Sequence, residues 1–271
     1  MFIAILKAVL VLGALGLIFG VVLAYAGKVF EMKKDEKFEL INEALPGANC
    51  GACGYAGCAA YADAIYNKGE KANLCSAGGD KVAARLAEIM GNEPETTEKL
   101  RAAVMCSGTS ENIEKKYNYK GINDCGTASR LGGGEKECSY GCVGLGTCLN
   151  SCKFDAIKIK NGIAVVDNDK CTACGMCVAA CPKGIIKLIP LDSTHWVRCA
   201  SEDKGAAIRK YCKAGCIACG ICEKSCPANA ILVKNNIAEI DYTKCNGCGI
   251  CVEKCPTKTI IGTEAKPEIQ E

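Results

Sequence analysis

Residues 171–182 read CTACGMCVAACP, residues 216–227 read CIACGICEKSCP and residues 245–256 read CNGCGICVEKCP. Each stretch spaces four cysteines as C-x2-C-x2-C-x3-C and places a proline directly after the last one. This spacing is typical of thiolates that ligate a [4Fe–4S] cluster, and the fourth cysteine of one run can ligate the cluster of a paired run. Three copies in one chain predict several such clusters.

Other uses of these cysteines fit less well. Zinc prefers four ligands at the corners of a tetrahedron, whereas three closely spaced thiolates suit a cube better. Disulfide frameworks belong mainly to short secreted chains, and this chain has 24 cysteines in 271 residues. The formal net charge is only +3, which does not indicate a nucleic-acid partner.

Moving the sequence along itself until Cys171 falls on Cys245 brings many other cysteines onto cysteines. We call this displacement the repeat shift. All four cysteines of residues 171–181 then fall on those of residues 245–255. Five cysteines upstream also fall on cysteines. The pairs are Cys125 on Cys199, Cys138 on Cys212, Cys142 on Cys216, Cys148 on Cys222 and Cys152 on Cys226. We therefore expect two successive copies of one module.

Each copy also contains a hairpin pattern. Alternating apolar residues flank Asn161-Gly162 in the first copy and Asn235-Asn236 in the second. Such pairs favour the tight turn of a two-stranded antiparallel hairpin. Short hairpins beside paired cysteine runs predict two bacterial ferredoxin-like modules with two clusters each.

The first module departs from the pattern, because Leu145 stands where the second module has Cys219. We expect Cys138 to replace the missing ligand. The predicted ligand sets in the first module are Cys138, Cys142, Cys148 and Cys181, and Cys152, Cys171, Cys174 and Cys177. Those in the second are Cys216, Cys219, Cys222 and Cys255, and Cys226, Cys245, Cys248 and Cys251.

A different cysteine motif precedes both modules. Residues 46–58 read PGANCGACGYAGC, and Cys75 follows, which gives the spacing C-x2-C-x4-C-x16-C. The glycines permit a close approach of the backbone to a cluster, and helices are expected over residues 59–67 and 80–90. We predict a single [4Fe–4S] cluster held by Cys50, Cys53, Cys58 and Cys75.

Four cysteines remain, which is the number that one more cluster needs. We expect them to form a sixth cluster between the two modules. The alternative is that some of them are buried free thiols, which pack as small apolar side chains. The four are Cys106, Cys125, Cys199 and Cys212.

The amino-terminal part contains an uninterrupted run without a charge, AVLVLGALGLIFGVVLAYAG at residues 8–27. As a helix this stretch would be about 30 Å long, the thickness of a bilayer core. Lysines follow it, at Lys28, Lys33, Lys34 and Lys37. We expect a single-pass anchor in the cytoplasmic membrane with the bulk of the chain on the cytoplasmic side. A cleaved signal peptide is the weaker alternative, since the apolar run is long.

The order of anchor, PGANCGACGYAGC motif and ferredoxin runs resembles the electron-transport B subunit of the Rnf complex family. The resemblance implies an α+β chain: a transmembrane helix at residues 1–30, a small helical single-cluster domain at 31–100, and tandem two-cluster modules at 101–190 and 191–271. Shorter members of that family carry only one such module.

The family resemblance implies that the chain is part of an ion-translocating ferredoxin:NAD+ oxidoreductase, with no complete catalytic site of its own. It would relay electrons one at a time from soluble reduced ferredoxin toward the NAD-reducing and ion-pumping subunits. No G-x-G-x-x-G follows a strand, so NAD and flavin are expected on other subunits. The alternative is a polyferredoxin that serves other reductases or a corrinoid protein activator.

Overall fold

The computed structural model describes residues 2–29, 35–93 and 99–262. The chain forms two compact units, Met1–Leu40 and Ile41–Glu271. The domain boundary expected at residue 30, and Lys33 and Lys34 on which the predicted membrane orientation partly rests, lie outside the described residues.

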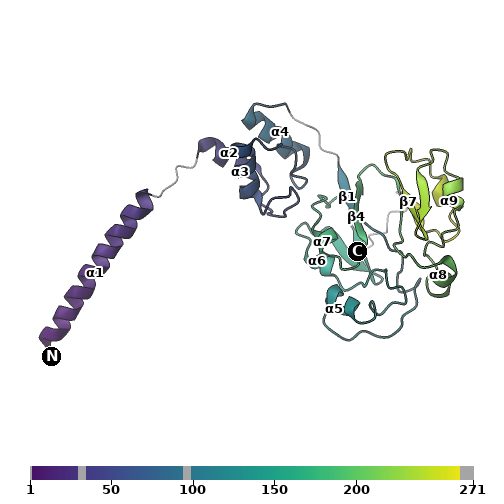
Figure 1. Ribbon diagram of the computed structural model, residues 1–271, viewed down its shortest axis with the longest axis horizontal. Helices are drawn as coiled ribbons and strands as arrows, with labels where there is room; N and C mark the ends of the chain where they lie inside the picture. The colour runs from purple at the N-terminus through teal and green to yellow at the C-terminus, as the bar shows by residue number, and fades with distance from the viewer. Residues whose placement is uncertain (1, 30–34, 94–98, 263–271) are drawn as a thin grey trace. The chain divides into compact units, whose positions relative to one another are not determined.

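The first unit contains one long helix, α1 (Phe2–Val29) (Figure 1). In the part of the chain that the structure describes, no helix combines the length and the apolar character needed to cross a membrane. The predicted transmembrane anchor is therefore wrong.

A small hydrophobic core is formed by three helices, which are α2 (Glu36–Ala44), α3 (Cys58–Lys68) and α4 (Gly79–Met90). Each helix contributes a side chain with no exposed surface: Ile41, Ile65 and Leu86. Helices α3 and α4 both end at a glycine in the left-handed conformation, which satisfies the last carbonyl groups. The helices expected over residues 59–67 and 80–90 are thus confirmed.

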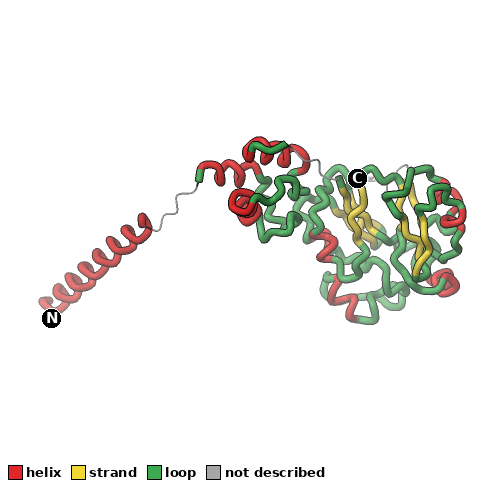
Figure 2. Tube along the Cα trace, turned by 45° about the horizontal axis from the view of Figure 1, so that its top comes forward, coloured by secondary structure: helices red, strands yellow, loops and turns green. Residues whose placement is uncertain are grey.

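Short strands and long loops build the rest of the second unit (Figure 2). In the part of the chain that the structure describes, the strands form four antiparallel pairs. These pairs are β1 (Leu100–Val104) with β4 (Ile186–Pro190), β2 (Ile157–Lys160) with β3 (Ile163–Val166), β5 (His195–Val197) with β8 (Ile260–Gly262), and β6 (Ile231–Lys234) with β7 (Ile237–Ile240).

The two expected hairpins are confirmed by the pairs β2–β3 and β6–β7. Their turns are Asn161-Gly162 and Asn235-Asn236, and all four residues have positive φ. That conformation gives a two-residue turn whose twist matches the twist of the strands.

The remaining helices are short and lie mostly in the cysteine runs. They are α5 (Cys125–Arg130), α6 (Thr147–Asn150), α7 (Met176–Ala180), α8 (Gly205–Tyr211), α9 (Ile221–Lys224) and α10 (Ile250–Lys254). The repeat shift carries the first residues of α6, β2, β3, α7 and β4 onto the first residues of α9, β6, β7, α10 and β8. The repeat found in the cysteines is therefore also a repeat of structure.

Gly144 marks a tight approach within the first module. Its φ is +85°, and a Cβ built on it would lie 2.3 Å from the carbonyl oxygen of Gly162 in the hairpin turn. We expect Gly144→Ala to lower the free energy of unfolding by more than about 2 kcal/mol, because both the conformation and the contact oppose a side chain.

Gly132 is the matched control, since its φ is +59° and a Cβ there meets nothing within 4 Å. Gly132→Ala should cost only about 1 kcal/mol, the conformational part alone. Denaturant unfolding of the iron-loaded variants measures both. Equal costs at the two positions would show that the contact with Gly162 contributes nothing.

Candidate metal centres

The front motif forms a loop that closes on itself. Gly51 and Gly54 have φ of +76° and +85°, which lets the loop turn between the cysteines. The backbone N–H of Cys58, at the start of α3, donates to Oδ1 of Asn49 at 2.8 Å. Burial raises the pKa of the Cys75 thiol, and the nearby thiols of Cys50, Cys53 and Cys58 raise it further. The structure thus brings all four expected cysteines together.

A buried tyrosine holds the last of these cysteines in place. Tyr61 is 1% exposed, and its hydroxyl donates to the carbonyl oxygen of Lys71 at 2.6 Å. The same hydroxyl accepts from the backbone N–H of Leu74 at 3.1 Å. The segment that leads into Cys75 is therefore fixed to α3.

Four cavities in the rest of the second unit are each lined by four cysteines. Each has a cavity volume of about 20 Å³. Two of the four sets match the expectation from the sequence. They are Cys152, Cys171, Cys174 and Cys177 in the first module, and Cys216, Cys219, Cys222 and Cys255 in the second.

Backbone N–H groups point at several of these sulfurs. Ala102 donates to Sγ of Cys171 at 3.4 Å and Ala230 donates to Sγ of Cys226 at 3.3 Å. Burial alone would raise the pKa of Cys255, but hydrogen bonds from the backbone around Ile260 and Thr259 hold it below its usual value. Such donors stabilise a thiolate, the form that binds metal.

The other cysteine run of the second module gathers in the same way. Burial raises the pKa of Cys251 to about 11, and the neighbouring thiols of Cys245 and Cys248 contribute to the rise. Cys226 lies at the end of the preceding run, just after α9, whose last residue is Lys224.

The structure divides the remaining cysteines differently from our expectation. The third cavity is lined by Cys125, Cys142, Cys148 and Cys181, so Cys125 takes the position that we gave to Cys138. Burial raises the pKa of Cys148 to about 12, with further contributions from Cys142, Cys125 and Cys181. The fourth cavity is lined by Cys106, Cys138, Cys199 and Cys212.

The placement of Cys125 has a local cause. Asp124 caps helix α5 by accepting from the backbone N–H of Thr127 at 2.6 Å. The backbone N–H of Cys125 donates to the hydroxyl of Thr147 at 2.8 Å, which fixes the start of α5 beside the start of α6. Cys125 therefore lies next to the segment that lacks a thiol at Leu145.

The donor sets suit clusters better than single ions. Among the described residues, no three His, Cys, Asp or Glu side chains converge as the ligands of one metal ion would. A cubane separates its four thiolates, because each one binds a different iron at a corner of the cube. Four thiols around one cavity fit that larger group, and thiolate is the ligand that iron–sulfur clusters take.

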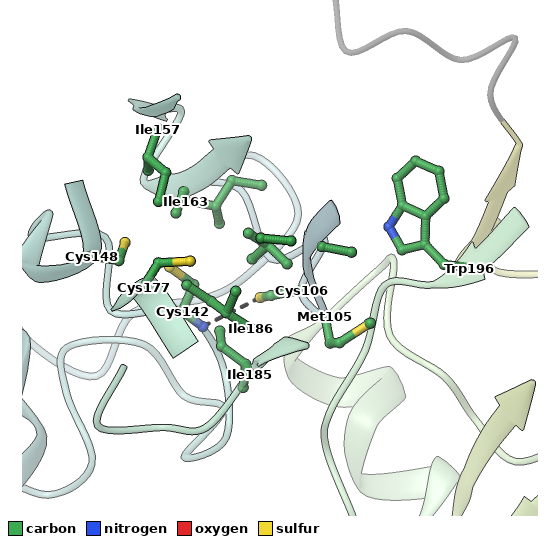
Figure 3. Close-up of a cluster of buried hydrophobic side chains, with 14 of the residues drawn as sticks. Met105, Cys106, Cys142, Cys148, Ile157, Ile163, Cys177, Ile185, Ile186 and Trp196 are labelled. Carbon is green, nitrogen blue, oxygen red and sulfur yellow. Dashed lines mark hydrogen bonds between the residues drawn. The ribbon is translucent and has the colours of Figure 1, made fainter. Parts of the chain in front are cut away.

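Figure 3 shows how closely two of these sets approach one another. Cys142, Cys148 and Cys177 are drawn beside one another, and Cys106 lies next to Cys142. A dashed line joins the backbone N–H of Cys142 to Sγ of Cys106, a hydrogen bond of 3.4 Å.

Three family models match parts of the chain. The model described as "Putative Fe-S cluster" matches residues 45–77, "4Fe-4S binding domain" matches residues 164–187, and "4Fe-4S dicluster domain" matches residues 215–259. These ranges contain the front motif and the three cysteine runs of the ferredoxin type.

Three similar proteins cover most of the chain. The B subunit of the Na(+)-translocating ferredoxin:NAD(+) oxidoreductase complex of Acetobacterium woodii is 49% identical over 89% of this chain and 73% of its own length. The B subunit of the proton-translocating ferredoxin:NAD(+) oxidoreductase complex of Clostridium ljungdahlii is 41% identical over 89% of this chain and 86% of its own length. The B subunit of the ion-translocating oxidoreductase complex of Methanosarcina acetivorans is 42% identical over 89% and 91%.

Proposed function

This chain belongs to the family of the B subunits of the ion-translocating ferredoxin:NAD(+) oxidoreductase (Rnf) complexes, and from that premise we propose how it works. It is an electron-relay subunit of such a complex. It takes electrons from reduced ferredoxin and passes them toward the subunits that bind NAD and flavin. The observation that carries the proposal is the gathering of cysteines around cavities in sets of four.

Five of these sets are proposed to hold [4Fe–4S] clusters, each of which accepts and donates one electron when bound. The residues of the chain supply thiolates, hydrogen bonds to sulfur and a cavity that keeps water away. The proposed ligand sets are Cys50, Cys53, Cys58 and Cys75; Cys125, Cys142, Cys148 and Cys181; Cys152, Cys171, Cys174 and Cys177; Cys216, Cys219, Cys222 and Cys255; and Cys226, Cys245, Cys248 and Cys251.

Within the unit Ile41–Glu271, the front loop lies beside the first module. Lys153 donates from Nζ to the carbonyl oxygen of Ala48 at 2.8 Å. Cys50 lies close enough to Cys174 to contribute to the rise in the pKa of Cys174 that burial causes first. These contacts support a path that leads from the front set to the set of Cys174.

We propose that the chain lies on the cytoplasmic side of the membrane-associated complex. Thiolate ligands persist in a reducing compartment, whereas an oxidising one converts free thiols to disulfides. Twenty of the 24 cysteines of the chain are proposed cluster ligands. The other subunits of the complex are its expected partners.

The test is anaerobic titration of the full iron-loaded chain with reduced ferredoxin, followed by electron paramagnetic resonance. Reduced ferredoxin should give up one electron for each cluster that it can reduce. If dithionite reduces the clusters while reduced ferredoxin does not, the proposed donor is wrong. If the chain purified in mild detergent carries no other subunit, a free polyferredoxin replaces the relay subunit as the better description.

A further inference from the structure

One of the cavities lined by four cysteines has none of its cysteines within the three ranges that the family models match. Its cysteines are Cys106, Cys138, Cys199 and Cys212. Apolar side chains line part of it, among them Ile113 and Ile208, which are 6% and 1% exposed. The family models match residues 45–77, 164–187 and 215–259, and none of these four cysteines falls within them.

Two of the four cysteines occupy equivalent positions in the two modules. Val104 at the end of β1 pairs with Ile186, and Val197 at the end of β5 pairs with Ile260. The repeat shift carries Ile186 onto Ile260, so Val104 and Val197 occupy equivalent positions. Cys106 and Cys199 stand at the same short distance beyond their respective strands. In both modules the hydrogen bonding between these two segments continues one residue beyond the strands. The backbone N–H of Met105 donates to the carbonyl oxygen of Ile185 at 2.8 Å, and the backbone N–H of Arg198 donates to the carbonyl oxygen of Thr259 at 2.9 Å.

The other two cysteines are equivalent by the repeat shift itself. Cys138 is followed by Gly141, and Cys212 is followed by Gly215. A Cβ built on Gly141 would lie 3.6 Å from Sγ of Cys138, and one on Gly215 would lie 3.5 Å from Sγ of Cys212. Each module therefore supplies two cysteines to one cavity from matching positions.

Hydrogen bonds join this set to one neighbouring set in each module. The backbone N–H of Cys142 donates to Sγ of Cys106 at 3.4 Å. In the second module the backbone N–H of Cys216, the repeat equivalent of Cys142, donates to Sγ of Cys199. A ligand of a proposed cluster on each side thus touches a sulfur of this set.

We propose that Cys106, Cys138, Cys199 and Cys212 ligate a sixth [4Fe–4S] cluster at the junction of the two modules. The inference rests on the proposed function and adds a centre to it. The proposed cluster accepts one electron from the neighbouring cluster that Cys142 ligates and passes one electron to the neighbouring cluster that Cys216 ligates. The transfer can also run in the opposite direction. No bond of the protein forms or breaks in the transfer. The cluster also ties the two modules together, since each supplies half of its ligands.

The first test counts iron and acid-labile sulfide in the full wild-type chain purified without oxygen. Six clusters give about 24 of each per chain, and five give about 20. This measurement does not depend on the folding of any variant. A count of about 20 in a chain that still accepts electrons from reduced ferredoxin would overturn the sixth cluster and leave the proposed function intact.

Paired substitutions test the ligand set. Cys106→Ala should lower the iron count to about 20, and adding Cys138→Ala should lower it no further, because both residues serve one cluster. Adding Cys125→Ala to Cys106→Ala should instead lower the count to about 16. The opposite pattern would overturn our assignment. Ile122→Ala is the control, since the Ile122 side chain is exposed and lines none of these cavities, and it should leave about 24.

Discussion

Removing iron from the chain without oxygen is expected to unfold the ferredoxin part of Ile41–Glu271. The buried core of the first module is built partly from the proposed ligands, with Cys106, Cys142, Cys148 and Cys177 packed beside Ile157, Ile163, Ile185 and Ile186 (Figure 3). The second module repeats this arrangement with Cys222, Cys251 and Cys255. The proposed clusters therefore replace much of the apolar core that modules of this size would otherwise need.

Binding a cluster contributes directly to the free energy of folding, because the unfolded chain has no preformed site. Structural zinc, for comparison, contributes about 10–16 kcal/mol in small metal-dependent domains. Typical domains have about 5–15 kcal/mol in total.

The loss of folded structure is measured by circular dichroism and by the dispersion of amide proton chemical shifts in NMR spectra, before and after iron is removed by anaerobic chelation. We expect cooperative unfolding to disappear and to return when iron and sulfide are restored. The helical part around Tyr61 and Ile65 is the internal comparison, because its buried side chains are not cysteines. An iron-free chain that keeps its dispersed spectrum and its unfolding transition would contradict the view that the clusters support the core.

The sequence predicted the elements that depend on short-range chemistry. The turns Asn161-Gly162 and Asn235-Asn236 need positive φ, which these residues adopt more readily than others, so the hairpins followed from the turn residues alone. The cysteine runs likewise place three sulfurs around one cavity by their spacing. Both predictions depend on close neighbours along the chain.

The sequence did not predict how Cys125 and Cys138 divide between two sets. The repeat shift equates Cys125 with Cys199, but the strand pairs equate Cys106 with Cys199. The two alignments disagree because the segment between Cys106 and Cys138 is longer than the segment between Cys199 and Cys212 and includes α5. The position of a cysteine shortly after a strand in each module could have indicated the correct division. Using that signal requires knowing which strands pair.

The amino-terminal helix shows a different limit. The apolar stretch at residues 8–27 predicted a helix correctly, and α1 covers it. Hydropathy along a sequence estimates only how well a segment would dissolve in lipid. The anchor was inferred from that estimate, and no helix in the described ranges meets the requirement for spanning.

Arg101→Gln is expected to lower the reduction potential of the proposed cluster beside Cys171. Arg101 is 2% exposed, and its guanidinium lies 4.3 Å above the ring of Trp196. It donates to the carbonyl oxygen of Ser193 at 3.0 Å and to Oδ1 of Asn168 at 3.4 Å. These partners are all uncharged, so they do not neutralise the guanidinium.

The charge that balances Arg101 is expected to be the cluster itself. Burial lowers the pKa of Arg101, and the nearby groups that oppose this shift are Tyr242 and Cys171. Ala102, the next residue of β1, donates its N–H to Sγ of Cys171 at 3.4 Å. A cation at this position favours the reduced state of a cluster, because reduction adds a negative charge. Two unit charges about 10 Å apart in an effective dielectric constant of about 20 interact by about 1.7 kcal/mol, so we expect a shift of up to about 70 mV for one electron.

Arg101→Lys separates charge from shape. Lysine keeps the positive charge but loses the planar fork that donates to two acceptors and stacks on Trp196. We expect Arg101→Lys to lower stability while leaving the potential nearly unchanged, and Arg101→Gln to lower both. Potentiometric titration followed by electron paramagnetic resonance measures the potential in each full-length, iron-loaded variant. If Arg101→Gln retains all its iron and the potential does not move, Arg101 only packs β1 against Trp196, and the cluster charge is balanced by solvent instead.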